Sequence, residues 1–447
     1  MYKGNGLSVT LRTTEEPACC QNKGVTLIGG HAMQASKPDL SEDFKMTKIG
    51  PLPEEWQIVR LGEVLREMDV RVRDLGESAY ELPILSLTKN EGLVLQTERF
   101  GKRIATEDVS EYKVVYRGQI VYNPYVIWEG AVHILDKYEA GLVSPVYPVW
   151  EVRPDKAHAW FIDPLLRMPN TISAYNRFAS GAVNRRRAIR KNDFLSIPIP
   201  LPPLPEQRAI AHVLRTVQRA KEATERVIAA LKELKKSLMR HLFTYGPVPI
   251  DQADRVPLKD TEIGPIPEHW QVVRLGEVAQ VKYGKAKPEG EGTVPVVGSG
   301  GVYAYTKMAL VGFPTLVIGR KGTAGQVWLC KQPCWPSDTT FYLEWRKPIG
   351  LGFVFEFMRI NPPSGEHAKT TLPSLQRSDL ENHLLPFPPL PEQQTIANIL
   401  RTVDRRIEAE ENRKRALEAL FKTLLHHLMT GKVRVKDLAA GDAEAPT

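Results

Sequence analysis

The strongest constraint in this sequence is an internal repeat with a period of about 200 residues. The block Ile-Gly-Pro-Leu-Pro-Glu-Glu-Trp-Gln-Ile-Val-Arg-Leu-Gly-Glu-Val at residues 49–64 recurs with few changes at residues 263–278. A second block, which begins Pro-Pro-Leu-Pro-Glu-Gln at residues 202–207, recurs at residues 388–393. A period of this size exceeds the roughly 20–50 residues of solenoid repeats and predicts a tandem duplication of a larger unit. Two similar halves predict pseudo-twofold symmetry, which suits a two-sided partner such as duplex DNA or a pair of identical subunits.

Each Pro-Pro-Leu-Pro-Glu-Gln block is followed by a helical pattern. Pro205 and Pro391 stand where a first-turn proline is tolerated, and the glutamate behind each favours the positive start of a helix. In the first copy, apolar or small residues alternate at steps of three and four and predict a coiled-coil seam: Ile210, Val213, Val217, Ala220, Thr224, Val227, Leu231, Leu234 and Leu238. The second copy keeps this register at both ends, at Ile396, Ile399, Val403, Leu417, Leu420 and Leu424. Between these positions the second copy has three charged residues, Arg406, Glu410 and Arg413. They predict that the middle of this helix is more polar and better hydrated than its ends.

A helix of this length can act as a rigid spacer. At a rise of about 1.5 Å per residue, the segment from Pro205 to Phe243 would be roughly 58 Å long. A single amphipathic helix cannot bury its apolar face alone, so we expect the two copies of the helix to pair. If a twofold axis relates the two halves, the paired helices are antiparallel. The alternative is two unrelated core helices that each pack on their own domain.

The segments between the repeated blocks carry short β-rich runs such as residues 112–116 and 315–318. We therefore predict an α+β fold with two strand-rich domains separated by a pair of long antiparallel coiled-coil helices. Short helices are expected near Trp160–Met168 and Gly352–Met358. The expected boundaries are a flexible N-terminal extension (1–45), a first domain (46–203), a first spacer helix (204–246), a linker (247–262), a second domain (263–389), a second spacer helix (390–431) and a C-terminal tail (432–447).

Composition narrows the class of protein. The formal charge of +8 and a pI near 9.1 suit a polyanionic partner without requiring one. No run of about 18 apolar residues is present, so we expect a cytoplasmic protein without membrane spans. Four cysteines are too few for a disulfide framework in a chain of 447 residues. Cys330 and Cys334 could supply two zinc ligands, but no second pair completes a site, so no metal is expected.

Catalytic motifs are weak or missing. Asn361-Pro362-Pro363-Ser364 resembles the Asn-Pro-Pro-aromatic loop of amino methyltransferases, but the aromatic residue is absent. No glycine-rich turn between a strand and a helix precedes it to hold S-adenosylmethionine; residues 319–325 run into another strand and predict a β-turn. The sequence also lacks a Walker motif. We therefore expect a non-catalytic chain that binds no cofactor itself.

Basic and polar turns are the candidates for DNA contact. Such side chains can bind phosphates or donate bidentately to guanine, and neighbouring aromatic and amide groups can contact base edges. The candidates in the first half are Tyr122, Asn123, Tyr125, Arg185, Arg186, Arg187, Arg190 and Lys191. Those in the second half are Lys282, Lys285, Arg320, Lys321 and Thr323, with Lys287 nearby. A solvated charged surface is the alternative for each.

The order of these blocks resembles the specificity subunit of type I restriction-modification systems. The resemblance rests on Pro-x-x-Trp at the start of each half and on the repeated Leu-Pro-Glu-Gln helices, and it covers about residues 47–432. Family members generally begin near Met46–Trp56, so residues 1–45 would be an extension or would reflect a misplaced start codon.

The resemblance implies a division of labour between subunits. Two target-recognition domains would each read one half of a bipartite DNA sequence, and the helix pair would set their separation. The chain would assemble with two methyltransferase subunits and two restriction subunits. These partners would bring S-adenosylmethionine, ATP and Mg²⁺, and the complex would methylate adenine and cleave DNA in an ATP-dependent reaction.

Two other functions remain open. A self-sufficient adenine methyltransferase would use Asn361, Pro362 and Pro363, and the purified chain would then bind S-adenosylmethionine and methylate DNA unaided. A coiled-coil adaptor would not contact DNA, and electrophoretic shifts with methyltransferase subunits present would separate it from a specificity subunit.

Overall fold

A computed structural model describes residues 44–102, 104–179, 188–365 and 374–435. The chain divides into two compact units, Met1–Glu54 and Glu55–Thr447. The described part of the first unit is a hairpin of β1 (Phe44–Thr47) and β2 (Gly50–Pro53). Residues 46–54, which we expected to open the first domain, thus lie in the first unit, because β1 pairs with β2. The expected flexible extension lies almost wholly outside the described residues.

The turn of this hairpin is repeated in the second copy and explains part of the duplicated sequence. Gly50 and Gly264 both have positive φ, 110° and 99°, which side chains other than glycine rarely tolerate. Thr47 Oγ1 donates to the Gly50 carbonyl at 2.5 Å, and Thr261 Oγ1 donates to the Gly264 carbonyl at 2.7 Å. The repeated Thr-x-Ile-Gly sequence therefore encodes one turn twice.

The first domain is built on a four-stranded antiparallel sheet in the order β4-β11-β8-β9. Two-stranded pairs β3-β12, β5-β6 and β7-β10 surround it. The elements are β3 (Gln57–Arg60), α1 (Leu61–Val64), β4 (Leu65–Met68), η1 (Val72–Asp74), η2 (Glu77–Glu81), β5 (Leu85–Leu87), β6 (Leu93–Leu95), α2 (Gln96–Phe100), β7 (Lys113–Tyr116), β8 (Ile120–Tyr122), η3 (Ile127–Glu129), β9 (Val132–Ile134), β10 (Ala140–Val143), β11 (Val149–Val152), α3 (Ala159–Leu165), α4 (Pro169–Phe178), α5 (Lys191–Leu195) and β12 (Pro198–Leu201).

The second domain repeats this topology. Its central sheet has the order β16-β22-β19-β20, and β15-β23 matches β3-β12. β17 and β18 form a hairpin with a bulge, and β21 joins it in parallel. The elements from the linker onward are η5 (Ile250–Arg255), β13 (Leu258–Lys259), β14 (Ile266–Pro267), β15 (Gln271–Arg274), α7 (Leu275–Val278), β16 (Ala279–Tyr283), β17 (Val294–Gly298), β18 (Gly301–Thr306), β19 (Thr315–Gly319), β20 (Val327–Cys330), β21 (Trp335–Pro336), β22 (Thr340–Trp345), α8 (Leu351–Ile360), α9 (Arg377–Glu381) and β23 (Leu384–Phe387).

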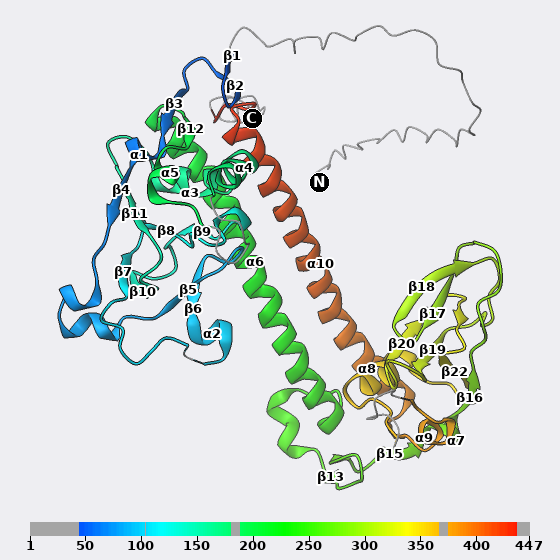
Figure 1. The fold of residues 1–447 in the computed structure, drawn as a ribbon. Helices are drawn as coiled ribbons and strands as arrows, with labels where there is room; N and C mark the ends of the chain where they lie inside the picture. Colours follow the sequence, from blue (N-terminus) through cyan, green and yellow to red (C-terminus); the bar gives the residue numbers. More distant parts are fainter. Residues whose placement is uncertain (1–43, 103, 180–187, 366–373, 436–447) are drawn as a thin grey trace, which may run out of the picture. The chain divides into compact units, whose positions relative to one another are not determined.

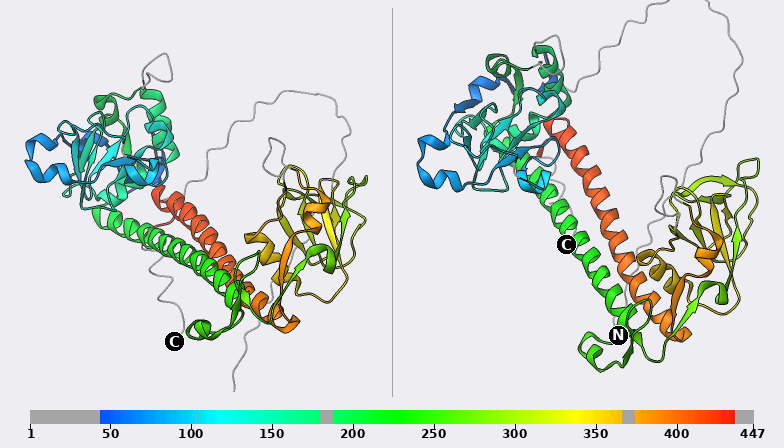
Figure 2. Two further views of the ribbon diagram at one scale, coloured as in Figure 1. Left: turned by 90° about the horizontal axis from the view of Figure 1, so that it is seen from below. Right: turned by 60° about the horizontal axis from the view of Figure 1, so that its bottom comes forward.

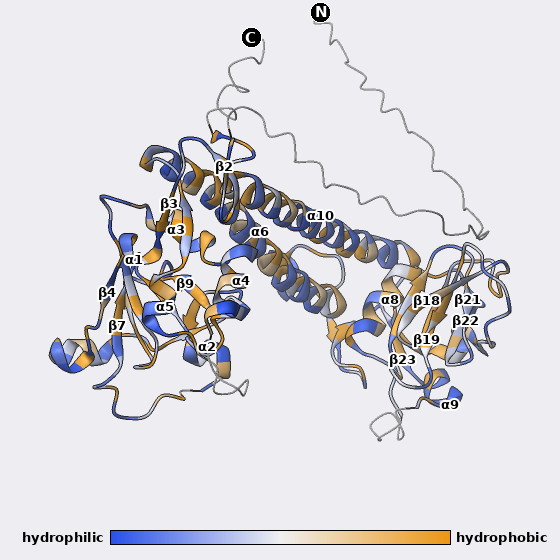
Figure 3. Cartoon of the chain, turned by 45° about the horizontal axis from the view of Figure 1, so that its top comes forward, coloured by the Kyte–Doolittle hydropathy of each residue, from blue (hydrophilic) through white to orange (hydrophobic). Residues whose placement is uncertain are grey.

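Two long helices, which together we name the strut, follow the two domains. They are α6 (Leu204–Tyr245) and α10 (Leu390–Met429), and they lie side by side (Figures 1 and 2). Ion pairs join Glu225 to Lys414 and Lys235 to Asp404. Along the contact, the residue numbers of α10 therefore decrease as those of α6 increase. The helices are therefore antiparallel. The solvent-facing sides of both are largely hydrophilic, as expected for an amphipathic pair (Figure 3).

The seam of the strut differs in phase from our prediction. Val227, Leu234 and Leu420 are 41%, 48% and 45% exposed, so these three predicted seam residues face solvent. Their neighbours turn inward instead: Ile228 is 8% exposed and Lys235 8%. Ile210 and Ile396 are buried, and the other predicted packing residues are half-buried: Val213, Val217, Leu231, Leu238, Ile399, Val403, Leu417 and Leu424.

The observed burial follows a regular heptad in each helix. The inward positions on α6 are Ile210, Leu214, Val217, Lys221, Thr224, Ile228, Leu231, Lys235, Leu238 and Leu242. Those on α10 are Gln393, Ile396, Leu400, Val403, Ile407, Glu410, Lys414, Leu417, Phe421, Leu424 and Leu428. The predicted and observed seams of α6 share every second residue, such as Ile210, Val217 and Leu231. They differ between these because α6 has apolar residues at two adjacent heptad positions, for example Val213 and Leu214, and the sequence does not show which of the two faces inward. The middle of the seam is polar, as predicted. Glu410 lies inward as expected, and Lys414 is the next inward residue, whereas the side chains of Arg406 and Arg413 are 63% exposed.

The duplicated Trp and Glu-Gln residues fasten each domain to its helix. Trp56 Nε1 donates to Glu206 Oε2 at 3.1 Å, and Trp270 Nε1 donates to Glu392 Oε2 at 2.9 Å. Gln393 Oε1 accepts the Gly350 amide at 2.7 Å, and its Nε2 donates to the Pro388 carbonyl at 2.8 Å. Gln207 makes the same two bonds, to His158 N and Pro202 O. The first domain is thus attached at the start of α6, and the second at the start of α10.

Each junction is completed by the end of the other helix. Arg434, beyond α10, pairs with Glu206 at 2.7 Å, and Met239, Leu242 and Phe243 of α6 join the core of the second domain. In an antiparallel pair this places the two domains at opposite ends of the strut, related by a pseudo-twofold. None of the described helices has the length and apolar composition to cross a membrane.

Candidate DNA interface

Equivalent turns leave the central sheet of each domain and gather the candidate residues. The turn after β8 contains Asn123 and Tyr125, and the turn after β19 contains Arg320, Lys321 and Thr323. The Ile189 amide donates to Pro124 O at 3.2 Å, and the Leu375 amide donates to Arg320 O at 2.8 Å. The chain returning toward α5 or α9 therefore runs beside the turn in both domains. This contact places Arg190 and Lys191 near Asn123 and Tyr125.

Tyr122 is a core residue and not a surface contact, which corrects our prediction. Its side chain is 0% exposed, and its ring lies 4.5 Å from that of Phe194 between centroids. Burial raises the pKa of the phenol. The strand alternation that buries Val121 does not expose Tyr122, because α5 covers that side of the sheet end through Phe194. Tyr122 can support the turn but cannot reach a base.

The turn that follows is held by Asn123 and presents Tyr125. Asn123 Oδ1 accepts the Tyr125 amide at 3.0 Å, and its Nδ2 donates to the Tyr147 hydroxyl at 3.2 Å. Both ends of the Asn123 amide are thus used within the domain. Tyr125 is 45% exposed and is available to a partner.

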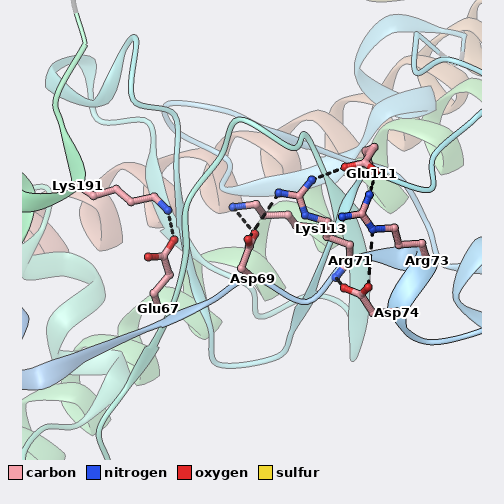
Figure 4. A network of polar contacts seen from close by, with 8 residues as sticks. All are labelled: Glu67, Asp69, Arg71, Arg73, Asp74, Glu111, Lys113 and Lys191. Atoms are coloured by element: carbon pink, nitrogen blue, oxygen red, sulfur yellow. Dashed lines mark hydrogen bonds and ion pairs between the residues drawn. The ribbon is translucent and has the colours of Figure 1, made fainter.

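The basic candidates of the first domain have acidic neighbours. Lys191 pairs with Glu67 of β4, next to a network in which Glu111 pairs with Arg71 and Arg73 (Figure 4). The Lys113 ammonium, 2.9 Å from Asp69 Oδ1, lowers the pKa of that carboxyl. Among the described residues, this face is therefore charge-balanced and forms no continuous basic patch. Arg190 is exposed, whereas Arg185, Arg186 and Arg187 lie outside the described residues.

Arg320 has the most defined geometry among the candidates of the second domain. Its guanidinium lies 5.3 Å from the Tyr283 ring centroid and 5.9 Å from that of Phe341. Nη2 donates to the Asp338 carbonyl at 3.0 Å. Aromatic packing and one backbone bond limit the rotamers of this side chain, so less entropy is lost when it binds a phosphate or a guanine.

The remaining candidates surround Arg320 on exposed turns. Thr323 Oγ1 donates to the Ser299 carbonyl, which brings the β17-β18 turn against the β19-β20 turn. Lys321, Thr323 and Lys285 are exposed. Lys282 pairs with Glu344 across the sheet at 2.6 Å, so its charge is balanced.

Sequence reasoning missed the aromatic surface of the β17-β18 hairpin. Tyr303 and Tyr305 of β18 are 59% and 55% exposed, and Tyr283 is 48% exposed; Tyr303 lies at the bulge of the β17-β18 hairpin. The available signal was the run Val-Tyr-Ala-Tyr directly after two glycines, because a strand with so many aromatic and β-branched residues beside a glycine turn is typical of a hairpin. The tyrosines extend the candidate surface beside Arg320.

The Asn361-Pro362-Pro363 segment packs behind this surface. A Cβ on Gly325 would lie 2.3 Å from the Pro363 carbonyl, so Gly325 permits close contact between that segment and the β19-β20 turn. Its neighbour Gly322 has φ +81°, as in a tight turn. The segment therefore supports the turn. Within the part of the chain described, no group of three or more metal-binding side chains occurs.

A family model and several known proteins match this chain. The model for the type I restriction modification DNA specificity domain matches residues 171–233 and 267–419. The type I restriction enzyme MjaVIII specificity subunit of Methanocaldococcus jannaschii is 26% identical over 439 residues, which cover 89% of this chain and 97% of that protein. The MjaX specificity subunit of the same organism is 26% identical over 434 residues, 88% of this chain and 97% of that protein.

The fold also matches a solved structure. The S subunit of a type I restriction-modification system from M. genitalium has a TM-score of 0.59 at 16% identity, covering 83% of this chain and 96% of that one. The match spans both strand-rich domains and the strut, because it covers most of each chain.

Proposed function

We propose that this chain, which belongs to the family of type I restriction-modification specificity subunits, recognises a bipartite DNA sequence with one half-site for each strand-rich domain. The observation that carries the proposal is the duplication of one sheet topology at the two ends of an antiparallel strut. Each domain presents an equivalent pair of turns. Two similar readers at a set separation match two short DNA elements with an unread gap between them.

The length of the strut limits that gap. The 42 residues of α6 span about 63 Å at about 1.5 Å per residue. At about 3.4 Å per base pair this corresponds to some 18 base pairs as an upper bound on the separation of the readers.

In the part of the chain that the structure describes, the reading surfaces combine a small number of exposed cations with exposed aromatic side chains. Tyr125 and Arg190 in the first domain, and Arg320, Lys321 and Tyr303 in the second, are the side chains we assign to DNA contact. Because neighbouring cations are balanced by Glu67 and Glu344, we expect local contacts and a moderate salt dependence.

The chain is a non-catalytic subunit, and its chemistry belongs to its partners. We assign assembly with two methyltransferase and two restriction subunits, which suits the pseudo-twofold of the strut. S-adenosylmethionine, ATP and Mg²⁺ would bind those partners. The complex would then methylate adenine and cleave DNA in an ATP-dependent reaction.

Exchange of one domain tests the proposal. Residues 279–386 are replaced by the corresponding segment of another family member, and the methylated sites of host DNA are mapped by single-molecule sequencing. We expect one half-site to change and the other to persist. A change in both half-sites, or a methylome that does not depend on the gene, contradicts the proposal.

A further inference from the structure

A buried ionic cluster joins the second domain to both helices of the strut. Lys235 of α6 is 8% exposed, and its Nζ lies 2.7 Å from Asp404 of α10 and 3.0 Å from Glu356 of α8. Glu356 is 6% exposed and also faces Arg359 Nη1 at 3.3 Å. One ammonium group therefore connects three helices, two from the strut and one from the domain.

A buried ionic cluster of this kind contributes little net free energy of folding, but it favours one arrangement of the three helices over others. Charges lose hydration when buried, and the loss is offset only while each group keeps its partners at hydrogen-bonding distance. A small rotation of α8 would move Glu356 away from Lys235, so each buried charge would lose one of its two partners: Lys235 would keep only Asp404, and Glu356 only Arg359. Apolar packing alone would resist that rotation less, because its contacts are not directional.

Among the described residues, the corresponding junction of the first domain contains no such three-helix cluster. The offset of 186 residues between the helix starts places Phe421 at the position equivalent to Lys235, and Gln218 at that of Asp404. Gln218 Nε2 donates along its own helix to Glu222 at 2.8 Å. The acidic residue of α3, Asp163, turns into its domain and pairs with Arg167 at 2.7 Å.

A cavity occupies the space that the cluster fills at the other end. Its volume is about 420 Å³, and its lining includes Trp160, Pro164, Gln218, Glu222 and Phe421. The Arg215 guanidinium covers Trp160 at 3.7 Å from the ring centroid. The pseudo-twofold is therefore broken where α8 and α3 meet the strut. Lys235 pairs with Glu356 and Asp404 beside α8, whereas an open space lies beside α3, although Arg434 pairs with Glu206 at the start of α6.

We propose that Lys235, Glu356 and Asp404 are positioning residues that hold the second domain in one orientation on the strut and so determine which gap between half-sites the protein accepts. This inference rests on the proposed function, because a gap exists only if the target is bipartite. The first domain, without such a cluster, adjusts to the DNA. The range of gaps between half-sites that the protein accepts is thus determined where the second domain meets the strut.

The test compares Lys235→Met with Lys232→Met. Lys232 lies on the same helix and pairs with Glu411 of α10 at 2.8 Å, but both of these side chains are exposed. Each full-length variant is assembled with its methyltransferase subunits. Methylation rates are measured on DNA with the native gap and with gaps one base pair shorter or longer.

We expect Lys235→Met to lose at least about tenfold of its discrimination against the altered gaps, equivalent to about 1.4 kcal/mol. The base preferences within each half-site should persist, and Lys232→Met should behave as the native chain does. If Lys235→Met keeps its discrimination, the inference is wrong. If the native chain directs methylation to no bipartite site, the proposed function itself fails.

A second variant guards against misfolding. Lys235→Met/Glu356→Gln removes the buried carboxylate together with its buried cation. The two groups that lose a partner, Asp404 and Arg359, have side chains that are 41% and 47% exposed and can be hydrated instead. Nitroxide labels carried by unnatural amino acids at exposed Ala229 and Tyr303 then report the distance between the strut and the second domain. A broader distance distribution than in Lys232→Met supports the positioning role, and an unchanged distribution contradicts it.

Discussion

Single side chains decide how the repeated blocks become junctions. Glu206 and Gln207 of the first block, and Glu392 and Gln393 of the second, satisfy backbone or indole groups that would otherwise be buried without partners. These hydrogen bonds explain why both blocks have the same Glu-Gln pair at positions where an apolar residue would pack equally well. The sequence revealed the repetition, but the partners, such as the Gly350 amide, lie more than 40 residues away and could not be inferred.

We expect Gln393→Leu to lower the free energy of unfolding by about 2–4 kcal/mol, because it leaves a buried amide and a buried carbonyl unpaired. The matched control is Gln394→Leu, at an exposed position one residue further along α10. Urea unfolding of both variants gives the comparison. Equal values for the two variants would show that the Gly350 and Pro388 bonds add nothing to stability.

Buried histidines make the stability sensitive to acid. Burial lowers the pKa of His383 to about 4, below its ordinary value of about 6.5. Protonation therefore favours the unfolded chain, so the contribution is complete above about pH 6.5 and is lost as the pH falls toward 4, by up to about 3 kcal/mol. We expect His383→Gln to flatten the fall in unfolding free energy between pH 6.5 and 4. The exposed His212→Gln is the control, and identical slopes for both would contradict the assignment.

At the scale of elements, periodicity predicted the two long helices and their antiparallel pairing but not the phase of their seam. α6 has apolar residues at both Val227 and Ile228, and a lysine follows Leu234. From sequence alone, Leu234 is a better seam residue than Lys235, because burial of a charged lysine without a partner costs free energy. Lys235 lies inside because Asp404 and Glu356 meet it there, and these carboxylates come from distant segments. Similarly, Tyr122 was assigned to the surface because the covering residue, Phe194, lies over 70 positions later.

The phase of the seam can be tested at adjacent positions. We expect Ile228→Ala to lower the free energy of unfolding by about 2–4 kcal/mol, because it opens a cavity between the helices. Val227→Ala should change it by less than about 0.5 kcal/mol, because that side chain is largely in solvent. Thermal or urea unfolding distinguishes the two phases, and the reverse order of effects would restore the seam predicted from sequence.

At the scale of the whole molecule, the proposed function makes the length of the strut the quantity that sets the DNA spacing. Its central part, residues 224–230 of α6 and the facing residues 409–415 of α10, lies between the two junctions. Removal of seven residues from each helix preserves the heptad phase and rotates one domain about the strut axis by only about 20°. The separation of the readers falls by about 10 Å, or about three base pairs.

We therefore expect the double deletion to shorten the unread gap by about three base pairs while both half-sites persist. Three base pairs also turn the duplex by about 100°, since about 10.5 base pairs make one turn. The second half-site then faces away from a reader that has rotated little, so methylation should weaken unless one domain adjusts. The first domain, which lacks the ionic cluster, is the one that can adjust. Mapping methylation on a library of gap lengths measures both effects, and an unchanged gap would mean that the strut does not set the spacing.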